Sequence, residues 1–120
     1  MLNINEQSTD KYDKFKYILP VVEFINDNYN RNHSVQEYAN ICNLDKYYFI
    51  KLFSEYTGVS PLLFKTRIRM EKAKELLINT NMTNGHIAEI VGYSSSYYFS
   101  RIFKRHTGIS PELFRKTNGK

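Results

Sequence analysis

The sequence predicts an all-α fold of two helix-turn-helix subdomains joined by a long linker helix, about seven helices in all. The first observation is a repeat: YYFIKLFSEYTGVSPLLFK at 47–65 returns as YYFSRIFKRHTGISPELFR at 97–115, with 10 identities in 19 positions. The second is residues 61–79, which carry no glycine and no proline after the first position. The third is that no segment alternates apolar and polar residues as a half-buried strand does.

Each copy of the repeat reads as a helix, a tight turn and a second helix. Ser34 and Glu37 have the spacing of a capping box, which begins the first helix of copy one. Asn43 stands at the turn where copy two has Gly92, and both residue types tolerate a positive φ. Asp45 can cap the second helix of copy one, as Ser94 or Ser95 can in copy two, where one extra residue follows the turn.

The second helix of each copy carries an apolar stripe at positions i, i+3, i+4 and i+7, which predicts the face that packs on the core. The stripe consists of Phe49, Leu52, Phe53 and Tyr56 in copy one and of Phe99, Ile102, Phe103 and His106 in copy two. Tyr48 and Tyr98 flank the stripe and are predicted to pack. A Thr-Gly pair then ends each helix, and a Ser-Pro pair begins the next.

The linker helix is predicted at 61–79, about five turns long, and is followed by a breaker cluster at 79–85. Apolar residues at helical spacing between 18 and 29 predict one more helix before copy one, with Pro20 either in its first turn or kinking the segment there. These patterns divide the chain into a flexible segment (1–16), a first subdomain (17–59), the linker helix (60–79), a second subdomain (80–117) and a tail (118–120).

Composition and charge indicate a globular protein that binds a polyanion. The 120 residues are 42% hydrophobic and 24% charged, with a net charge of +5. Residues 1–45 hold 4 basic and 7 acidic side chains, whereas residues 46–120 hold 13 basic and 5 acidic ones. Such a basic region favours nucleic acid as the partner. No apolar run of 18 residues and no signal peptide is found, so we expect a cytoplasmic protein without a membrane span.

The outer face of each repeated helix lies opposite the apolar stripe, where a helix-turn-helix reads base edges in the major groove. The predicted base contacts are Tyr47, Ile50 and Lys51 in copy one and Ser96, Tyr97, Ser100 and Arg101 in copy two. Arginine suits guanine, and tyrosine or isoleucine suits a thymine methyl group. The alternative is that these positions are simply solvated, as polar helix faces usually are.

Phosphate contacts are predicted from the cationic linker helix and from helix N-termini. The candidates are Ser34, Val35, Lys46, Arg67, Arg69 and Lys104. The alternative for the linker cations is a solvated row in which Glu71 and Glu75 neutralise their neighbours.

No catalytic residue, cofactor or metal site is expected. His33, His86 and His106 are scattered along the chain, and Cys42 is the only cysteine, which excludes a disulfide or a multi-cysteine metal site. Cys42 also falls on the predicted core face, where it is expected to act as a small buried hydrophobic residue.

The second copy and the linker resemble a known family. IAEIVGYSSSYYFSRIFK at 87–104 with the TGISPELFR that follows, and IRMEKAKELL at 68–77, are similar to the AraC/XylS-type DNA-binding domain over about residues 17–117. The resemblance implies base-reading roles for Tyr47, Lys51, Ser96, Tyr97 and Arg101. The chain departs from the family pattern at Asn43, Ile50, Lys51, Asn84 and Gly85, and the last two weaken the predicted start of a helix.

The resemblance implies sequence-specific binding of double-stranded DNA for transcription regulation. Recognition helices at about 45–57 and 95–107 would enter successive major grooves, and one monomer would bind an asymmetric site. The alternative is a protein-interaction module that docks on RNA polymerase, with DNA binding secondary. Besides DNA, the candidate partners are therefore RNA polymerase and an N-terminal effector or receiver domain, which the family carries and which is not seen here. Some family members are fused to alkyl-transfer repair modules, but those use several cysteines.

Overall fold

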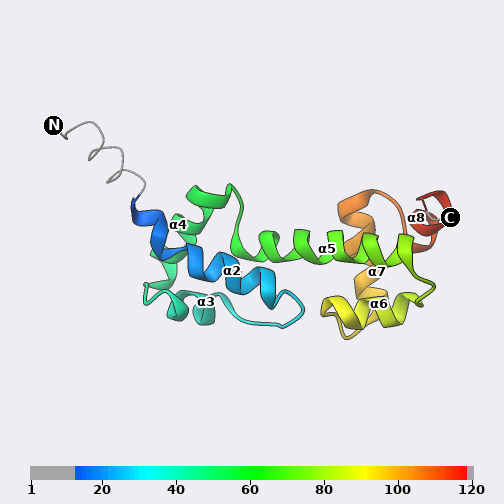
Figure 1. Cartoon of the computed structure of the whole chain (residues 1–120), viewed down its shortest axis with the longest axis horizontal. Helices are drawn as coiled ribbons and strands as arrows, with labels where there is room; N and C mark the ends of the chain where they lie inside the picture. The colour runs from blue at the N-terminus through cyan, green and yellow to red at the C-terminus, as the bar shows by residue number, and fades with distance from the viewer. Residues whose placement is uncertain (1–12, 119–120) are drawn as a thin grey trace. The chain divides into compact units, whose positions relative to one another are not determined.

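The computed structural model describes residues 13–118 and consists of helices and connecting turns (Figure 1). One short 3-10 helix, η1 (Lys14–Tyr17), precedes seven α-helices, and no strand occurs in this part of the chain. The α-helices are α2 (Leu19–Asp27), α3 (Val35–Ile41), α4 (Lys46–Thr57), α5 (Pro61–Asn79), α6 (Asn84–Val91), α7 (Ser96–Thr107) and α8 (Pro111–Asn118). The predicted all-α class is confirmed.

The described chain forms two compact units. The first comprises residues 13–28 and 33–65, and the second comprises residues 29–32 and 66–118. The division falls inside α5 after Lys65, so the linker helix contributes to both units. The predicted flexible segment at 1–16 lies mostly outside the described residues, although its last three residues belong to η1.

The first unit has a core built from one face each of α2, α3 and α4. Its fully buried side chains are Ile18, Val21, Ile25, Ala39, Phe49 and Phe53, with Tyr38 and Leu52 nearly so. Pro20 lies in the first turn of α2, as predicted, where its missing N–H removes no helical hydrogen bond. Phe53 meets Phe64 of α5 edge-on, with ring centroids 5.4 Å apart.

The second unit repeats this core with its own residues. Its buried cluster is Met70, Ala73, Leu77, Ile87, Ala88, Val91, Phe99 and Phe103. Phe103 meets Phe114 of α8 edge-on at 5.5 Å, which matches the Phe53–Phe64 pair of the first unit. The sequence repeat is therefore also a repeat of packing geometry.

One part of the predicted core stripe is wrong. Tyr56 is 44% exposed and His106 is also exposed, although both occupy the i+7 position of the stripe. Both residues lie in the last turn of their helix, where the chain leaves the core. Tyr56 instead contacts Phe15 beside the helix end, with ring centroids 5.3 Å apart.

The helix ends follow the predicted chemistry. Gly58 and Gly108 adopt left-handed conformations with φ values of 85° and 92°, which end α4 and α7. The hydroxyls of Ser60 and Ser110 each accept a hydrogen bond of 3.1 Å from the backbone N–H three residues later, at the start of α5 and α8. The linker helix spans 61–79, as predicted.

The predicted breaker cluster at 79–85 extends too far. Asn84 and Gly85 are the first two residues of α6, because the Thr83 hydroxyl accepts a 3.1 Å hydrogen bond from the His86 N–H and caps the helix. A good cap thus compensates for two weak helix formers. No helix in the described residues is both long and apolar enough to span a bilayer.

Candidate nucleic-acid interface

The α4 helix presents one face to its core and the opposite face to solvent. Asp45 caps it by accepting hydrogen bonds from the Tyr47 and Tyr48 N–H groups at 3.0 and 3.2 Å. On the outer face Tyr47 is 73% exposed and Lys51 is exposed, whereas Ile50 at the edge is half-buried. The three predicted base contacts of the first unit therefore share one accessible surface.

The α7 helix repeats this arrangement in the second unit. Ser95 caps it, with its hydroxyl accepting a 3.1 Å hydrogen bond from the Tyr98 N–H. Tyr97 is 72% exposed, almost the same as its counterpart in α4, and Ser96 and Arg101 are exposed beside it. Ser100 is half-buried, like Ile50 at the equivalent position. The four predicted base contacts of this unit also lie together.

Tyr48 and Tyr98, which were predicted to pack, are more exposed than a packing residue would be. Each follows the outer-face tyrosine directly and lies toward the start of its helix. Tyr98 contacts the ring of Tyr93 at 5.7 Å, so one side of it is covered. Each helix therefore begins with two adjacent accessible aromatic side chains.

Left-handed residues at the turns set the direction of both outer faces. Asn43 has a φ of 56° and Gly92 a φ of 110°, the two turn positions predicted from the sequence. The residue after each returns a backbone hydrogen bond to an alanine carbonyl, Leu44 to Ala39 at 3.0 Å and Tyr93 to Ala88 at 2.8 Å. The same turn thus precedes both candidate recognition helices.

Cations lie against both outer-face tyrosines. The Lys46 ammonium is 5.4 Å from the Tyr47 ring centroid, and the Arg101 guanidinium carbon is 5.9 Å from that of Tyr97. A cation over an aromatic ring is attracted by the negative face of the ring. These contacts help to hold a large exposed side chain in place before any partner binds.

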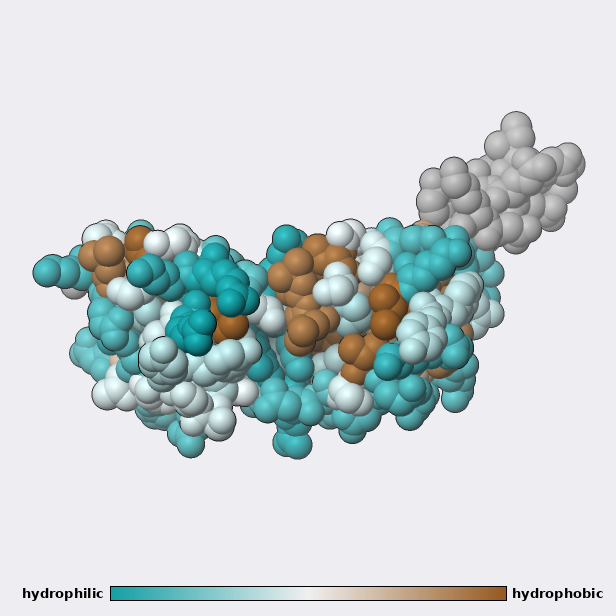
Figure 2. All heavy atoms as spheres, turned by 180° about the vertical axis from the view of Figure 1, so that it is seen from behind, coloured by the Kyte–Doolittle hydropathy of each residue, from teal (hydrophilic) through white to brown (hydrophobic). Residues whose placement is uncertain are grey.

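Figure 2 shows one molecular face, where hydrophilic residues predominate and hydrophobic ones form separate patches.

Arg69, predicted to contact phosphate, is instead an internal structural residue. Only 4% of the surface of Arg69 is exposed to solvent. Its Nε donates to the Tyr29 carbonyl at 2.6 Å, and one Nη donates to the Arg31 carbonyl at 3.2 Å and to Asn32 Oδ1 at 2.9 Å. The guanidinium also lies 4.8 Å from the Tyr93 ring centroid. Because this guanidinium is buried and bonded to the segment at 29–32, it does not face a bound duplex, and the predicted phosphate contact of Arg69 is wrong.

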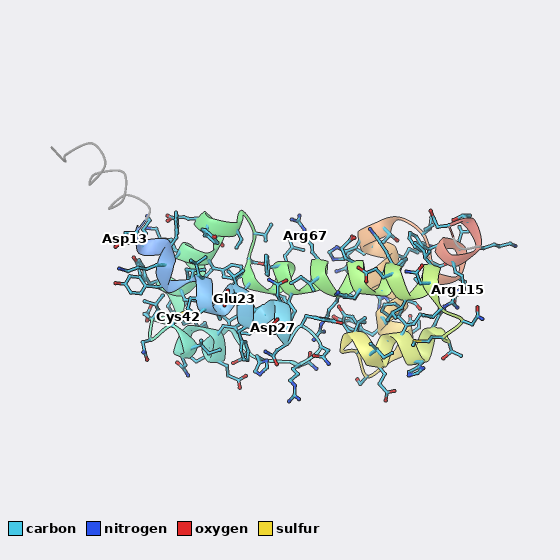
Figure 3. The ribbon with its side chains drawn as sticks, viewed as in Figure 1. Asp13, Glu23, Asp27, Cys42, Arg67 and Arg115 are labelled. Carbon is cyan, nitrogen blue, oxygen red and sulfur yellow. The ribbon has the colours of Figure 1, made fainter. Side chains whose placement is uncertain are left out.

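The remaining cationic candidates are accessible. Arg67 is exposed, and Figure 3 shows its side chain extending outward from α5. Lys104 is exposed on α7, and Lys46 is half-buried beside Tyr47. Two linker lysines follow the alternative interpretation, because Lys74 pairs with Glu71 at 3.0 Å and Lys72 lies 4.0 Å from Glu75.

The start of α3 has a complete capping box. The Ser34 hydroxyl accepts from the Glu37 N–H at 3.1 Å, and the Ser34 N–H donates to the Glu37 carboxylate at 2.7 Å. That backbone hydrogen bond holds the pKa of Glu37 below its usual value. Because both Ser34 groups are engaged, the predicted phosphate contact here depends on the Val35 N–H.

Arg115 has a structural role that the sequence did not predict. Its Nε donates to the Leu77 carbonyl at 3.0 Å, and one Nη donates to the carbonyls of Thr80 and Met82 at 3.3 and 2.7 Å. It thereby satisfies carbonyls at and beyond the end of α5 that have no helical partner. The available sequence signal was the cation that recurs at this position of the repeat, Lys65 in copy one, which the structure also buries.

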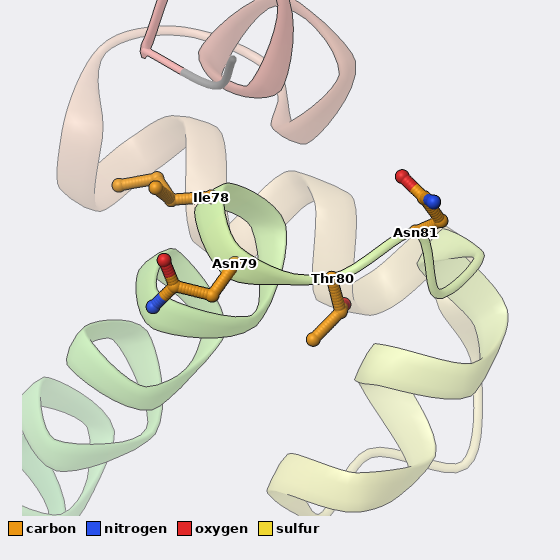
Figure 4. Close-up of a pocket in the computed structure, with 4 residues that line it drawn as sticks. All are labelled: Ile78, Asn79, Thr80 and Asn81. Carbon is orange, nitrogen blue, oxygen red and sulfur yellow. The ribbon is translucent and has the colours of Figure 1, made fainter.

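A pocket of about 270 Å³ lies where α5 ends, lined by Ile78, Asn79, Thr80 and Asn81 (Figure 4). None of these four side chains carries a charge. The pocket therefore holds no positive charge for a polyanion, and the candidate interface is built from other residues.

Known proteins share both the sequence and the helix arrangement of this chain. A family model described as a helix-turn-helix domain matches residues 38–117. The lactose operon transcription activator of Staphylococcus xylosus is 39% identical over 72 residues, which are 60% of this chain and 26% of that protein. The raffinose operon transcriptional regulatory protein of Pediococcus pentosaceus is 32% identical over 94 residues, 78% of this chain and 32% of that protein.

A solved structure agrees in fold and sequence. The C-terminal domain of AraT, a response regulator from Geobacillus stearothermophilus, superimposes with a TM-score of 0.83 at 31% identity, covering 87% of each chain. The chain spans about a quarter to a third of the length of the two regulators named above. The matched family model covers the α4 and α7 surfaces together with most of the helices that support them. The chain therefore belongs to the AraC/XylS-type family of helix-turn-helix DNA-binding domains.

Proposed function

We propose that this chain binds double-stranded DNA sequence-specifically and thereby regulates transcription, with α4 and α7 as its recognition helices. The observation that carries the proposal is the duplicated outer face. Each helix is capped, is anchored by buried phenylalanines, and presents an exposed tyrosine with a cation four residues later, Tyr47 with Lys51 and Tyr97 with Arg101. Two equivalent exposed faces of this kind suit two major-groove contacts.

The residue types suggest the role of each contact. Arg101 can bind the O6 and N7 atoms of guanine through two parallel hydrogen bonds. Tyr47, Tyr97 and Ile50 can contact thymine methyl groups, and Lys51, Ser96 and Ser100 can donate to base edges. Phosphate oxygens would be bound by Lys46, Lys104, Arg67 and the Val35 N–H at the start of α3.

We propose that one copy of the chain binds an asymmetric site. The outer faces of α4 and α7 differ in sequence, so their two half-sites should differ as well. Successive major grooves on one side of the duplex are about 34–36 Å apart, which sets the expected spacing of the half-sites.

The larger protein context is also a proposal. Because the chain spans 26% and 32% of two regulators that it resembles, we propose that it acts with an effector or receiver domain. The AraT domain supports this view, because it is the C-terminal domain of a response regulator. Contact with RNA polymerase would be an additional role of the same regulator. Both this contact and DNA binding would take place in the cytoplasm.

We further propose that the chain is not an enzyme. Alkyl transfer would need a reactive thiolate, and Cys42 is the only cysteine. Partial burial raises the pKa of the Cys42 thiol, which lowers the fraction of thiolate at neutral pH. Incubation with alkylated DNA followed by intact mass measurement should leave the protein mass unchanged, and a mass increase of one alkyl group would overturn this statement.

The main proposal is tested by selecting bound sequences from random duplex DNA and then titrating a selected site in a mobility-shift assay at several salt concentrations. We expect enrichment of one asymmetric site and an affinity that falls steeply with salt. The double variant Tyr97→Ala/Arg101→Ala should lose the preference while its melting temperature is kept. Equal binding to all sequences, or a flat salt response, would overturn the proposal, and RNA polymerase binding without DNA binding would favour the docking alternative.

A further inference from the structure

The two units carry very different charges. In the described residues, the first unit has five basic and six acidic side chains, a net charge of −1, whereas the second has ten basic and four acidic ones, a net charge of +6. Among the residues that the structure describes, the excess of positive charge is therefore concentrated in one of the two helix-turn-helix units.

Few cations of the first unit are available to a polyanion. Lys14 pairs with Glu55 at 3.1 Å, and Lys16 pairs with Asp13 at 3.1 Å. Lys65 is buried. Of the described cations of this unit, two remain outside ion pairs and outside the core, Lys46 and Lys51.

The second unit keeps more of its cations available. Arg69 and Arg115 donate to backbone carbonyls, and Lys72 and Lys74 lie beside glutamates. Six exposed cations of the described part of this unit have no carboxylate partner: Arg31, Arg67, Arg101, Lys104, Arg105 and Lys116. Three of these six belong to α7 itself.

The two recognition helices differ most in charge at two equivalent positions. Ser54 in α4 corresponds to Lys104 in α7, and Glu55 corresponds to Arg105. Residues four apart are neighbours on a helix surface, so Arg101 and Arg105 repel each other in the free protein, whereas Lys51 and Glu55 attract. A polyanion bound at α7 would relieve that repulsion, and at α4 it would meet Glu55.

The start of α7 should also attract anions more strongly than the start of α4. The α4 cap is Asp45, whose carboxylate accepts two backbone N–H groups, whereas the α7 cap is the neutral Ser95. The N-terminus of a helix attracts anions, and a carboxylate already placed there reduces that attraction. On the outer face, the apolar Ile50 of α4 corresponds to the polar Ser100 of α7.

We propose, on the basis of the DNA-binding function argued above, that the two recognition helices divide the task. The α7 unit supplies most of the salt-dependent attraction to phosphates and reads a guanine through Arg101. The α4 helix supplies little charge and selects a thymine-containing half-site through Tyr47 and Ile50, which can contact the methyl group. The half-site read by α4 therefore contributes mainly specificity, and that read by α7 contributes mainly affinity.

The charge part is tested by exchanging the two differing positions. The α7 variant Lys104→Ser/Arg105→Glu should lose affinity by at least about tenfold at 0.1 M salt and flatten the slope of log K against log salt by about 2. The α4 variant Ser54→Lys/Glu55→Arg should bind more tightly with a steeper slope. A control matched to the α4 variant is Glu23→Arg/Asp27→Asn, which makes the same charge change of +3 on exposed positions of α2 (Figure 3). This control should leave the salt slope nearly unchanged.

The sequence part is tested by repeating the selection with Ile50→Ser and with Ser100→Ile. The first variant should lose a thymine preference at one position of one half-site, and the second should gain one in the other half-site. Thermal melts by circular dichroism check folding, and Ser54→Lys alone, which keeps the Lys14–Glu55 pair, tests the α4 charge effect independently.

The outcomes separate this inference from the proposed function. A wild-type chain that selects no sequence would overturn the function and the inference together. A wild-type chain that selects a site, while the α7 exchange changes the salt slope no more than the α2 control does, would overturn the inference alone. An unchanged thymine preference in the Ile50→Ser variant would overturn the proposed role of α4 in selecting a thymine.

Discussion

The Nε atom of Arg69 lies 2.6 Å from the carbonyl oxygen of Tyr29, so this arginine holds the segment at 29–32 instead of facing solvent. Gly92 completes the arrangement, because a Cβ at that position would lie 2.6 Å from an Arg69 Nη and 2.8 Å from the Asn30 carbonyl oxygen. The segment at 29–32 and the glycine at 92, far apart in the sequence, are thus both fitted to the same buried guanidinium.

Replacing Arg69 should destabilise the fold without altering base preference. Arg69→Met leaves the carbonyls of Tyr29 and Arg31 without their donor, which should lower the free energy of unfolding by at least about 2 kcal/mol. The matched variant Arg67→Met, on the exposed side of α5, should change stability by no more than about 0.5 kcal/mol. Urea unfolding measures both.

The same pair of variants distinguishes structure from DNA contact. Arg67→Met should flatten the salt dependence of binding by about one unit of slope, as expected for one lost phosphate contact. If Arg69→Met were stable and flattened the slope in its place, Arg69 would be a phosphate contact and its buried hydrogen bonds would be unimportant.

Gly92 and Gly58 allow a comparison of two left-handed glycines. Gly58→Ala should cost about 1–2 kcal/mol, since no atom lies within 4 Å of the new Cβ and only the backbone conformation is strained. Gly92→Ala should cost at least about 1 kcal/mol more, because the Cβ also displaces Arg69. Equal losses in chemical denaturation would show that Arg69 moves aside without penalty.

Arg101→Ala should weaken binding at one base pair. If Arg101 binds guanine through two hydrogen bonds, the loss should be about 1–3 kcal/mol on the selected site and should vanish when that guanine is replaced. Competition assays with singly substituted duplexes measure it. A loss that is uniform across all sequences would instead identify Arg101 as a backbone contact.

Glu37 should give stability that depends on pH. Its pKa is lowered in the folded chain, chiefly by the hydrogen bond from the Ser34 N–H, so its contribution is complete above the unfolded value of about 4.5 and is lost as the pH falls through the lower folded value. Glu37→Gln should therefore melt at a lower temperature than wild type at pH 7, with the difference closing in acid. A difference that stays constant from pH 7 to 3 would show that the charge contributes nothing.

Much of the fold follows from local chemistry. The caps at Ser34, Asp45 and Ser95 and the bounds of α5 were predictable, because a cap and a helical period depend on residues only three or four positions apart. The accessibility of Tyr47 and Tyr97 followed in the same way, since the face opposite a core stripe must be the outer one.

The errors have a common cause. Arg69 belongs to a cationic row in the sequence, but it bonds to carbonyls about forty positions earlier, and no spacing rule reports such a partner. Tyr56 and His106 continue the apolar period beyond the turn where their helices still touch the core. The sequence by itself determined the helices, their caps and the duplicated outer faces, because these depend on neighbours along the chain. Which cations are buried, paired or left available was decided only by the tertiary structure, because a charge finds its partners across space.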